Sequence, residues 1–352
     1  MTLTRRPLRV SALALGALFT TSALALAGCA GPGASESSDG PSIVATTTQV
    51  GDFTRELLGE QGTLTQLLQP NQSAHSFDPS AAQLRALASA DALVVNGAGL
   101  ETWIDDAISA SGFSGDLIDA STGIELHGTH EHEEGEDEHA EDEHAEDEHA
   151  EEGEDHEHEH AEGNPHIWTD PALAEVMVQN IAAGLEQIDG IDAAQIEANE
   201  TAYLDKLTAL DDWIRENVDQ VPADKRLLVT NHDAFTYFVE AYGITFVGSV
   251  IPSFDDNAEP SAAEIDELVA KIKATGVKAV FSEASISPKT AETIAREAGV
   301  EVFSGDDALY GDSLGVEGSP GATYIGSQIH NVTRILQSWG VEPSALPAVL
   351  QG

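Results

Sequence analysis

Short apolar runs alternate with longer amphipathic stretches along most of the chain, and this alternation limits the folds that it can adopt. Runs rich in β-branched and apolar residues predict strands at 42–47, 92–95, 117–119, 226–230, 244–247, 278–281 and 301–303. The intervening patterns predict helices at 52–58, 80–90, 100–110, 171–187, 193–218, 235–242, 261–275, 289–298 and 323–339. Strands that alternate with helices predict an α/β fold in which parallel sheets are flanked by helices.

The long helical pattern at 193–218 divides this alternation into two units. It ends before Pro222, which cannot continue a helix. We therefore predict an N-terminal α/β lobe over 41–190, a linking helix over 191–220 and a C-terminal α/β lobe over 221–352. A cleft is expected between the lobes, and clefts between domains are favoured ligand sites.

An insert at 127–163 interrupts the first lobe. It holds nine of the thirteen histidines of the chain, and the five-residue block EDEHA occurs three times in tandem. Because it has almost no apolar residues, it cannot bury enough surface to offset the entropy lost on ordering, and we predict a disordered loop. Histidine-rich tracts bind metal, so one interpretation is an accessory, low-affinity metal collector; a solvated acidic spacer is the other. The histidines assigned to this accessory site are His130, His132, His139, His144, His149, His156, His158 and His160.

The first 28 residues have the layout of a secretory signal peptide. Arg5, Arg6 and Arg9 form a basic start, and an uncharged, apolar and small-residue stretch follows. A membrane-spanning anchor is the alternative, but polar and small residues interrupt the stretch, and a span needs about 20 predominantly apolar residues. We predict export from the cytoplasm.

Cys29 is the only cysteine of the chain, so no internal disulfide is possible. It follows the small residues of the predicted cleavage zone, which resembles the bacterial lipobox. Lipidation of Cys29 would explain a lone cysteine in an exported protein, and the Gly-, Ser- and Pro-containing segment 29–40 would then be a flexible tether. We therefore predict a lipid-anchored protein on the extracytoplasmic face of the cell membrane.

The formal net charge of −47 argues against nucleic acid as a partner, because an acidic chain repels phosphate backbones and attracts cations. Outside the insert only four histidines remain. His75, His166 and His232 lie in polar turns at the ends of predicted strands or just before helices, where ligands of open α/β sheets bind. We expect these three to converge, whereas His330 lies in the middle of a predicted helix.

The surroundings of these histidines resemble a known family. The motifs are His75 with Asp78-Pro79, Asn164-Pro165-His166-Ile167-Trp168, Asn231-His232-Asp233-Ala234-Phe235, and Tyr310-Gly311-Asp312-Ser313-Leu314-Gly315, with a further segment from Phe281 to Gly299. Together they resemble the solute-binding proteins of zinc and manganese ABC importers, the cluster A-I or zinc-uptake family. The resemblance extends from Ile43 to the C-terminal helix.

The resemblance implies a metal site between two lobes joined by a rigid helix, with His75, His166, His232 and Asp312 as the ligands. Asp312 enters only through the family. Some zinc-binding members have an acidic residue beside the first histidine, but this chain has Ala74 there. The expected partners are the permease and ATPase of an ABC importer, and family members are usually monomers.

Three imidazoles and one carboxylate suit Zn²⁺, which accepts N and O ligands in a tetrahedron. Mn²⁺ prefers sites richer in oxygen, and the manganese-binding members of the family usually have Glu at the position of His232. The predicted cargo is therefore Zn²⁺, with Mn²⁺ as the alternative. The other ring nitrogen of each ligand needs an acceptor, and Asp170, Asp233 and Glu283 are the candidates for that role.

Two other classes of function compete with a transport receptor. A zinc hydrolase would use the three histidines and keep one position for water, but no glutamate base adjoins a ligand as in H-E-x-x-H, so we expect no enzyme. An extracellular metal buffer or adhesin would use the histidine-rich insert as its main site.

Overall fold

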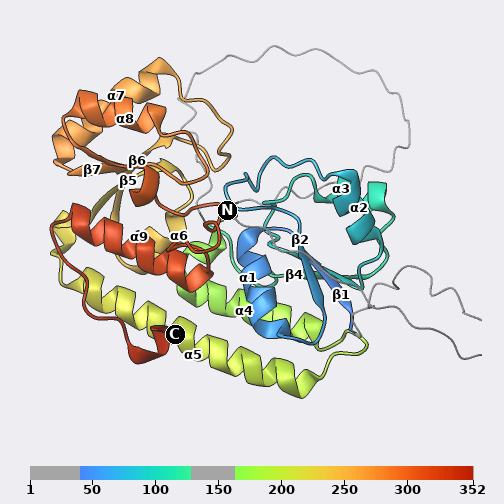
Figure 1. Cartoon of the computed structure of the whole chain (residues 1–352). Coiled ribbons are helices and arrows are strands. Elements are labelled where there is room, and N and C mark those ends of the chain that lie inside the picture. Colours follow the sequence, from blue (N-terminus) through green and yellow to red (C-terminus); the bar gives the residue numbers. More distant parts are fainter. Residues whose placement is uncertain (1–39, 128–162, 352) are drawn as a thin grey trace, which may run out of the picture. The chain divides into compact units, whose positions relative to one another are not determined.

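A four-stranded parallel sheet forms the centre of the first lobe (Figure 1). The computed structural model describes residues 40–127 and 163–351. The strands are β1 (Ser42–Ala45), β2 (Thr63–Gln66), β3 (Ala92–Val95) and β4 (Asp116–Asp119), in the spatial order β2-β1-β3-β4. All residues of β3 are buried, and three of the four in β1 are buried. This is expected for parallel strands that are covered on both faces.

Helices α1 (Thr48–Leu58), α2 (Ala81–Ala88) and α3 (Ile104–Ser111) connect these strands, and α4 (Pro171–Leu185) follows the sheet after the insert. Local chemistry sets several of their ends: Ser80 and Gln83 form a capping box on α2, and Asp170 caps α4, whose first residue is a proline. Because the strands are parallel, each crossover helix begins after the carboxyl end of one strand. The strand-to-helix turns therefore all lie at the same edge of the sheet.

The second lobe has two parallel pairs of strands. They are β5 (Leu227–His232) with β6 (Thr245–Ile251), and β7 (Ala279–Phe281) with β8 (Glu301–Phe303). Strand β5 also contacts β7, and helices α7 (Ala262–Thr275) and α8 (Lys289–Ala298) pack against this group (Figure 1). The short helix α6 (Thr236–Ala241) follows β5, and α9 (Tyr324–Ser338) is the last α-helix of the described residues.

The 27-residue helix α5 (Ala193–Asp219) is longer than any other described helix and packs against α4, α1 and α9 (Figure 1). Asp192 caps its first turn, and its inward side chains, including Leu207, Leu210 and Ile214, are fully buried. One hydrophobic core therefore includes residues from both lobes, such as Val44 and Phe281.

The predicted α/β class with parallel sheets flanked by helices is confirmed. The predicted helix at 193–218 is also confirmed, whereas its role as a domain boundary stays a prediction. Strand β2 was missed, because Thr63–Gln66 is short and alternates between exposed and half-buried positions instead of forming an apolar run. Helix α1 begins four residues before the predicted start, because the Thr47 hydroxyl accepts the amide of Val50 and caps it.

Several predictions concern residues outside the described ranges: the signal peptide, lipidation of Cys29, the tether and the eight accessory histidines from His130 to His160.

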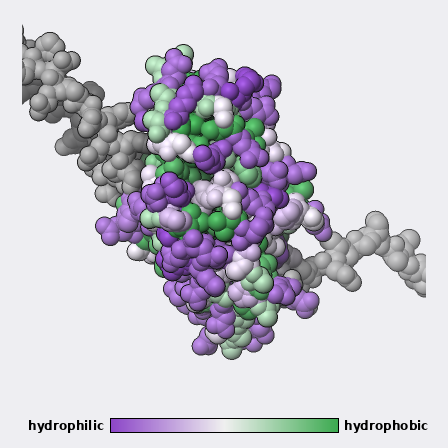
Figure 2. Space-filling model, turned by 90° about the vertical axis from the view of Figure 1, so that its left-hand side faces the viewer, coloured by the Kyte–Doolittle hydropathy of each residue, from purple (hydrophilic) through white to green (hydrophobic). Residues whose placement is uncertain are grey.

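On the face shown in Figure 2, hydrophilic residues dominate and apolar residues occur in small separate areas. Among the described residues, no helix combines the length and the apolar character that crossing a bilayer requires.

Candidate metal centre

Four side chains from both lobes converge on one point: His75, His166, His232 and Asp312. His75 lies in the loop between β2 and α2, and His166 directly precedes a short 3-10 helix (Ile167–Thr169). His232 is the last residue of β5, and Asp312 lies in the loop between β8 and α9. The three histidines that were expected to converge do lie together, His232 at the carboxyl end of β5 and the other two in loops.

The spacing of the donor atoms fits a single metal ion. Nε2 of His166 lies 3.2 Å from Nε2 of His75 and 3.2 Å from Nε2 of His232. The carboxylate of Asp312 lies 2.9 Å from His166, 3.2 Å from His232 and 3.6 Å from His75. Donors held at about 2.0–2.2 Å from a tetrahedral ion are roughly 3.3–3.6 Å apart. The four groups thus already have nearly the separations that zinc ligation requires.

The two deepest histidines are oriented by the same two-point contact. The Asn164 side-chain oxygen accepts the backbone amide of His166 at 3.0 Å and faces its Nδ1 at 2.6 Å. Glu283 Oε1 accepts the backbone amide of His232 at 3.1 Å and faces its Nδ1 at 2.7 Å. Each contact favours a proton on Nδ1 and directs Nε2 toward the other clustered side chains.

His75 is held less firmly. Its side chain is 8% exposed, whereas those of His166 and His232 are fully buried. Within the described residues no hydrogen bond reaches its Nδ1; the surrounding protein holds its backbone instead, through Thr102, whose hydroxyl donates to the His75 carbonyl at 3.2 Å, and Ser73, whose hydroxyl accepts the His75 amide at 3.2 Å. His75 therefore lies at the solvent-facing edge of the cluster.

The loop that carries Asp312 is held by the first lobe. The Gly311 carbonyl accepts hydrogen bonds from Gln49 at 3.1 Å and from the Trp168 ring at 3.2 Å. A Cβ at position 311 would lie 2.0 Å from Glu283 Oε2, so only glycine fits between that carboxylate and the loop. Both oxygens of Asp312 are buried and, in the described part of the chain, receive no hydrogen bond apart from the facing histidines. They remain available for a cation.

Burial and charge give these groups different protonation. Burial lowers the pKa of His166 to about 4, so its ring is neutral at neutral pH. Burial acts in the same direction on His232, but the carboxylates of Asp312 and Glu283 outweigh it and hold the pKa of His232 well above its usual value. Burial raises the pKa of Asp312, but the facing His232 and His166 outweigh it and hold that pKa well below its usual range. A cation that binds His232 would therefore have to displace a proton held more tightly than in an ordinary histidine.

The three predicted acceptors have different roles. Glu283 contacts a candidate ligand, as just described. Asp170 instead caps α4 by accepting the amide of Ala172, and the carboxylate of Asp233 accepts the hydroxyl of Thr236. The acceptor for His166 is Asn164, which belongs to a sequence motif but was not predicted to have this role. Its position two residues before a candidate ligand was the available signal.

His330 does not join the cluster. It lies in α9, where its Nε2 is 3.0 Å from the carbonyl of Ala308. This contact stabilises the loop before Tyr310 and supplies no open nitrogen directed at the other histidines.

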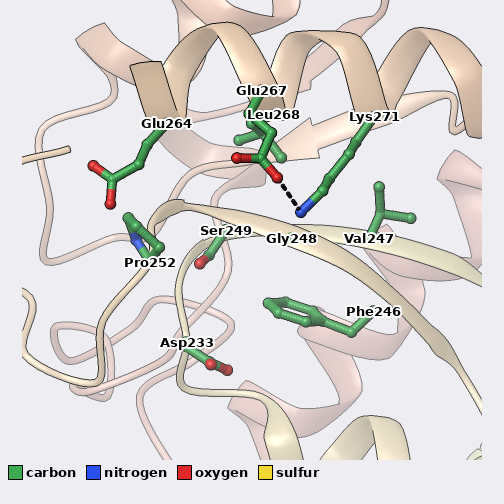
Figure 3. A pocket seen from close by; sticks show the side chains of 10 residues that line it. All are labelled: Asp233, Phe246, Val247, Gly248, Ser249, Pro252, Glu264, Glu267, Leu268 and Lys271. Atoms are coloured by element: carbon green, nitrogen blue, oxygen red, sulfur yellow. Dashed lines mark ion pairs between the residues drawn. The ribbon is translucent and has the colours of Figure 1, made fainter. Parts of the chain in front are cut away.

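A separate hollow of about 380 Å³ lies between β6 and α7 and contains none of the four clustered residues (Figure 3). Two of its acidic groups have structural partners. Glu267 pairs with Lys271 at 2.9 Å, and Glu264 accepts the amide of Ser261 in the capping box of α7. The only group of metal-binding side chains that converges within the described ranges is therefore the one around His166.

Comparison with known proteins agrees with this geometry. The family model described as "Zinc-uptake complex component A periplasmic" matches residues 43–338. The manganese-binding lipoprotein MntA of Halalkalibacterium halodurans is 29% identical over 88% of this chain and 93% of its own length. The zinc-binding protein AdcA of Streptococcus pyogenes is 31% identical over 74% of this chain and 48% of its own length.

Solved structures show the same fold. The periplasmic zinc-binding protein TroA of Treponema pallidum superimposes with a TM-score of 0.71 at 25% identity, over 85% of this chain and 99% of TroA. The family model covers most of the chain, and the converging histidines and aspartate lie within the matched region. The chain therefore belongs to the zinc-uptake component A family, the metal-binding solute-binding proteins of ABC importers.

Proposed function

We propose that this protein is an extracytoplasmic zinc receptor, which binds Zn²⁺ through His75, His166, His232 and Asp312 and delivers it to the permease and ATPase of a cognate ABC importer. The convergence of these four groups is the observation that carries the proposal. Four protein donors fill the coordination of a tetrahedral ion and leave no position for a catalytic water. This supports a carrier and not a hydrolase.

The donor set favours zinc over manganese. Three imidazole nitrogens and one carboxylate make a nitrogen-rich site, whereas Mn²⁺ prefers oxygen ligands. His232 decides this balance, since its Nε2 lies 3.2 Å from both His166 and Asp312. Cu²⁺ would also bind tightly by the Irving–Williams order, so availability outside the cell contributes to the choice of cargo.

Manganese is the second candidate, because relatives such as the MntA lipoprotein are named for it and cover nearly the whole chain. Metal analysis of protein purified without chelators, followed by competition between Zn²⁺ and Mn²⁺, distinguishes the two. We expect one equivalent of zinc in the cleft and displacement of Mn²⁺ by Zn²⁺. Retention of Mn²⁺ against equimolar Zn²⁺ would contradict the zinc assignment.

The histidine-rich insert has an accessory role in this proposal, and lipidated Cys29 anchors the receptor. Deleting residues 128–162 should remove weakly held extra ions and leave the tight site. Loss of the tight site itself would favour the metal buffer or adhesin over the receptor.

A further inference from the structure

A strained turn connects β3 to α3 beside the metal site. Gly97, Ala98 and Gly99 all have positive φ, at 76°, 54° and 73°. For alanine this left-handed conformation is unfavourable and persists only where the surroundings enforce it. A Cβ at Gly97 would lie 1.9 Å from the Asp119 carboxylate, so the close approach fixes that position as glycine.

The carboxylate of Glu101 holds this turn closed. Its Oε1 accepts the amide of Asn96 at 2.7 Å, and its Oε2 accepts the amide of Gly97 at 3.2 Å. The hydroxyl of Thr46, at the end of β1, donates a third hydrogen bond to the same carboxylate. Glu101 is only 5% exposed, and no oppositely charged side chain pairs with it in the described part of the chain.

Residues of this turn form hydrogen bonds with two of the loops that carry candidate ligands. The hydroxyl of Thr102 donates to the carbonyl of His75 at 3.2 Å, and the ring of Trp103 donates to the carbonyl of Ala74 at 3.0 Å. The side chain of Asn96 donates to the carbonyl of Pro165, directly before His166, at 3.3 Å. Residues on either side of Glu101 in the turn therefore hold the backbone at two candidate ligands.

We propose that Glu101 is a positioning residue of the metal site, whose buried carboxylate fixes the β3–α3 turn and, through it, the backbone at His75 and His166. The inference rests on the proposed metal-binding function. The hydrogen bonds of Glu101 go to Thr46, Asn96 and Gly97 and not to a ligand side chain, so it acts only through the turn. His75 depends on this support most, because its ring has no second acceptor in the described residues.

Burying a carboxylate without a counter-charge is unfavourable, and burial raises the pKa of Glu101 to about 7. All three of its partners are donors, so the ionised form is the one that the turn requires. A group that served stability alone could be replaced by a neutral acceptor at little loss. The free-energy cost of burying this carboxylate therefore points to a role in setting the geometry of the site.

Asp52 provides a control, although unlike Glu101 it pairs with an arginine, Arg55, at 2.9 Å. It is also a buried carboxylate, with a pKa that burial raises to about 6, and it also accepts a backbone amide, that of Tyr324 at 2.8 Å. That amide starts α9 and belongs to no ligand loop. Glu101→Gln and Asp52→Asn therefore make the same chemical change, one beside the ligand loops and one away from them.

The test uses the full chain with Zn²⁺ and with Co²⁺, whose visible absorption reports the geometry of its ligands. Glu101→Gln is expected to weaken Zn²⁺ binding by about tenfold, the scale of losses seen when groups behind metal ligands are changed, and to alter the Co²⁺ spectrum. Asp52→Asn should leave both unchanged. Thr46→Val, which removes only the third donor, should change the Co²⁺ spectrum in the same direction as Glu101→Gln, and its effect should not add to that of Glu101→Gln.

Melting temperatures measured on the metal-free variants separate stability from positioning. If Glu101→Gln and Asp52→Asn lose similar stability and both keep wild-type affinity and spectrum, the positioning role is overturned. If Glu101→Gln does not fold, an unchanged spectrum in Thr46→Val overturns it instead. If the wild type binds neither ion at the cluster, the proposed function is overturned as well. Results with the Glu101, Asp52 and Thr46 variants alone bear only on the positioning role.

Discussion

The deep and the outer parts of the metal site are built differently. His166 and His232 are fully buried, and one oxygen fixes both the backbone amide and Nδ1 of each. His75 is partly exposed and is held only through its backbone. A receptor must bind its ion tightly and also release it. Under the proposed function we expect the deep pair to set affinity and selectivity, and His75 to set the rate of exchange.

Removing a deep ligand should have the largest effect. His232→Ala deletes one donor and leaves the Glu283 carboxylate buried without its partner, so we expect Zn²⁺ affinity to fall by more than about 100-fold, beyond the usual loss for groups behind the ligands. His75→Ala should cost less. His330→Ala is the control, because His330 contacts the Ala308 carbonyl and the Tyr310 ring and none of the four clustered side chains. Calorimetric titration measures all three, and equal losses in His232→Ala and His330→Ala would refute the ligand set.

Weakening the orientation of a deep ligand should have the next largest effect. Glu283→Gln keeps an oxygen that can accept from His232 but removes the charge, and a loss of affinity of about 10-fold is expected, within the range for groups behind metal ligands. Glu283→Ala should lose more, because no acceptor remains. The matched control is Glu264→Gln, a fully exposed carboxylate in the same lobe. If Glu283→Gln and Glu264→Gln bind zinc equally well, the contact at 2.7 Å does not orient His232.

The deep pair also predicts how binding depends on pH. The carboxylates of Asp312 and Glu283 raise the pKa of His232 above its usual value, whereas burial lowers the pKa of His166 to about 4. Zn²⁺ must displace the His232 proton, and affinity should fall by about tenfold for each pH unit below the pKa of His232. In the metal-free protein the sign is opposite: the raised pKa stabilises the fold below the unfolded value and this contribution is lost as pH rises through the folded pKa.

Calorimetry in buffers of different ionisation enthalpy measures the protons released. We expect Zn²⁺ binding to release protons at pH 7 in the wild type and fewer in Glu283→Gln, where one of the two carboxylates that raise the pKa of His232 is gone. Release of no protons by the wild type would show that His232 is already neutral.

The sequence predicted the deep part of the site better than its supports. His166 and His232 could be chosen because each is a histidine in a polar turn at a strand or helix end, and that position follows from the α/β alternation. Asp312 could not be chosen in this way, since it is one of 62 acidic residues and its position depends on a loop between β8 and α9. Only the family resemblance singled it out.

Long-range contacts explain the remaining failures. Glu283 was one of three candidate acceptors, and only the contact of β5 with β7, the strand just before Glu283, brings it to His232, 51 residues earlier. Glu101 carries no local signal at all, because its role arises from amides of a turn with positive φ and from Thr46, 55 residues away. Propensity and periodicity report neighbours in sequence, whereas these roles come from tertiary packing.

Changes near His75, at the outer edge of the site, should alter the rate of Zn²⁺ release more than the affinity for Zn²⁺. Ser73 accepts the amide of His75 and donates to Asp256 of the β6–α7 loop at 2.7 Å. These contacts connect the two lobes beside the exposed histidine. Ser73→Ala removes both while leaving every ligand in place, and losing hydrogen bonds of this kind should speed Zn²⁺ release to a chelator by about 2- to 10-fold.

Ser111→Ala is the control for this rate, because Ser111 also bonds backbone groups of its own segment, in α3, but touches no ligand loop. Stopped-flow mixing with a chelator and a zinc-sensitive dye gives the rates. If Ser73→Ala releases zinc as slowly as Ser111→Ala, His75 is as firmly fixed as the deep pair and the two parts of the site do not divide the tasks. If Ser73→Ala is faster while Glu283→Gln mainly loses affinity, exchange is controlled at the outer edge, where the lobes meet beside His75.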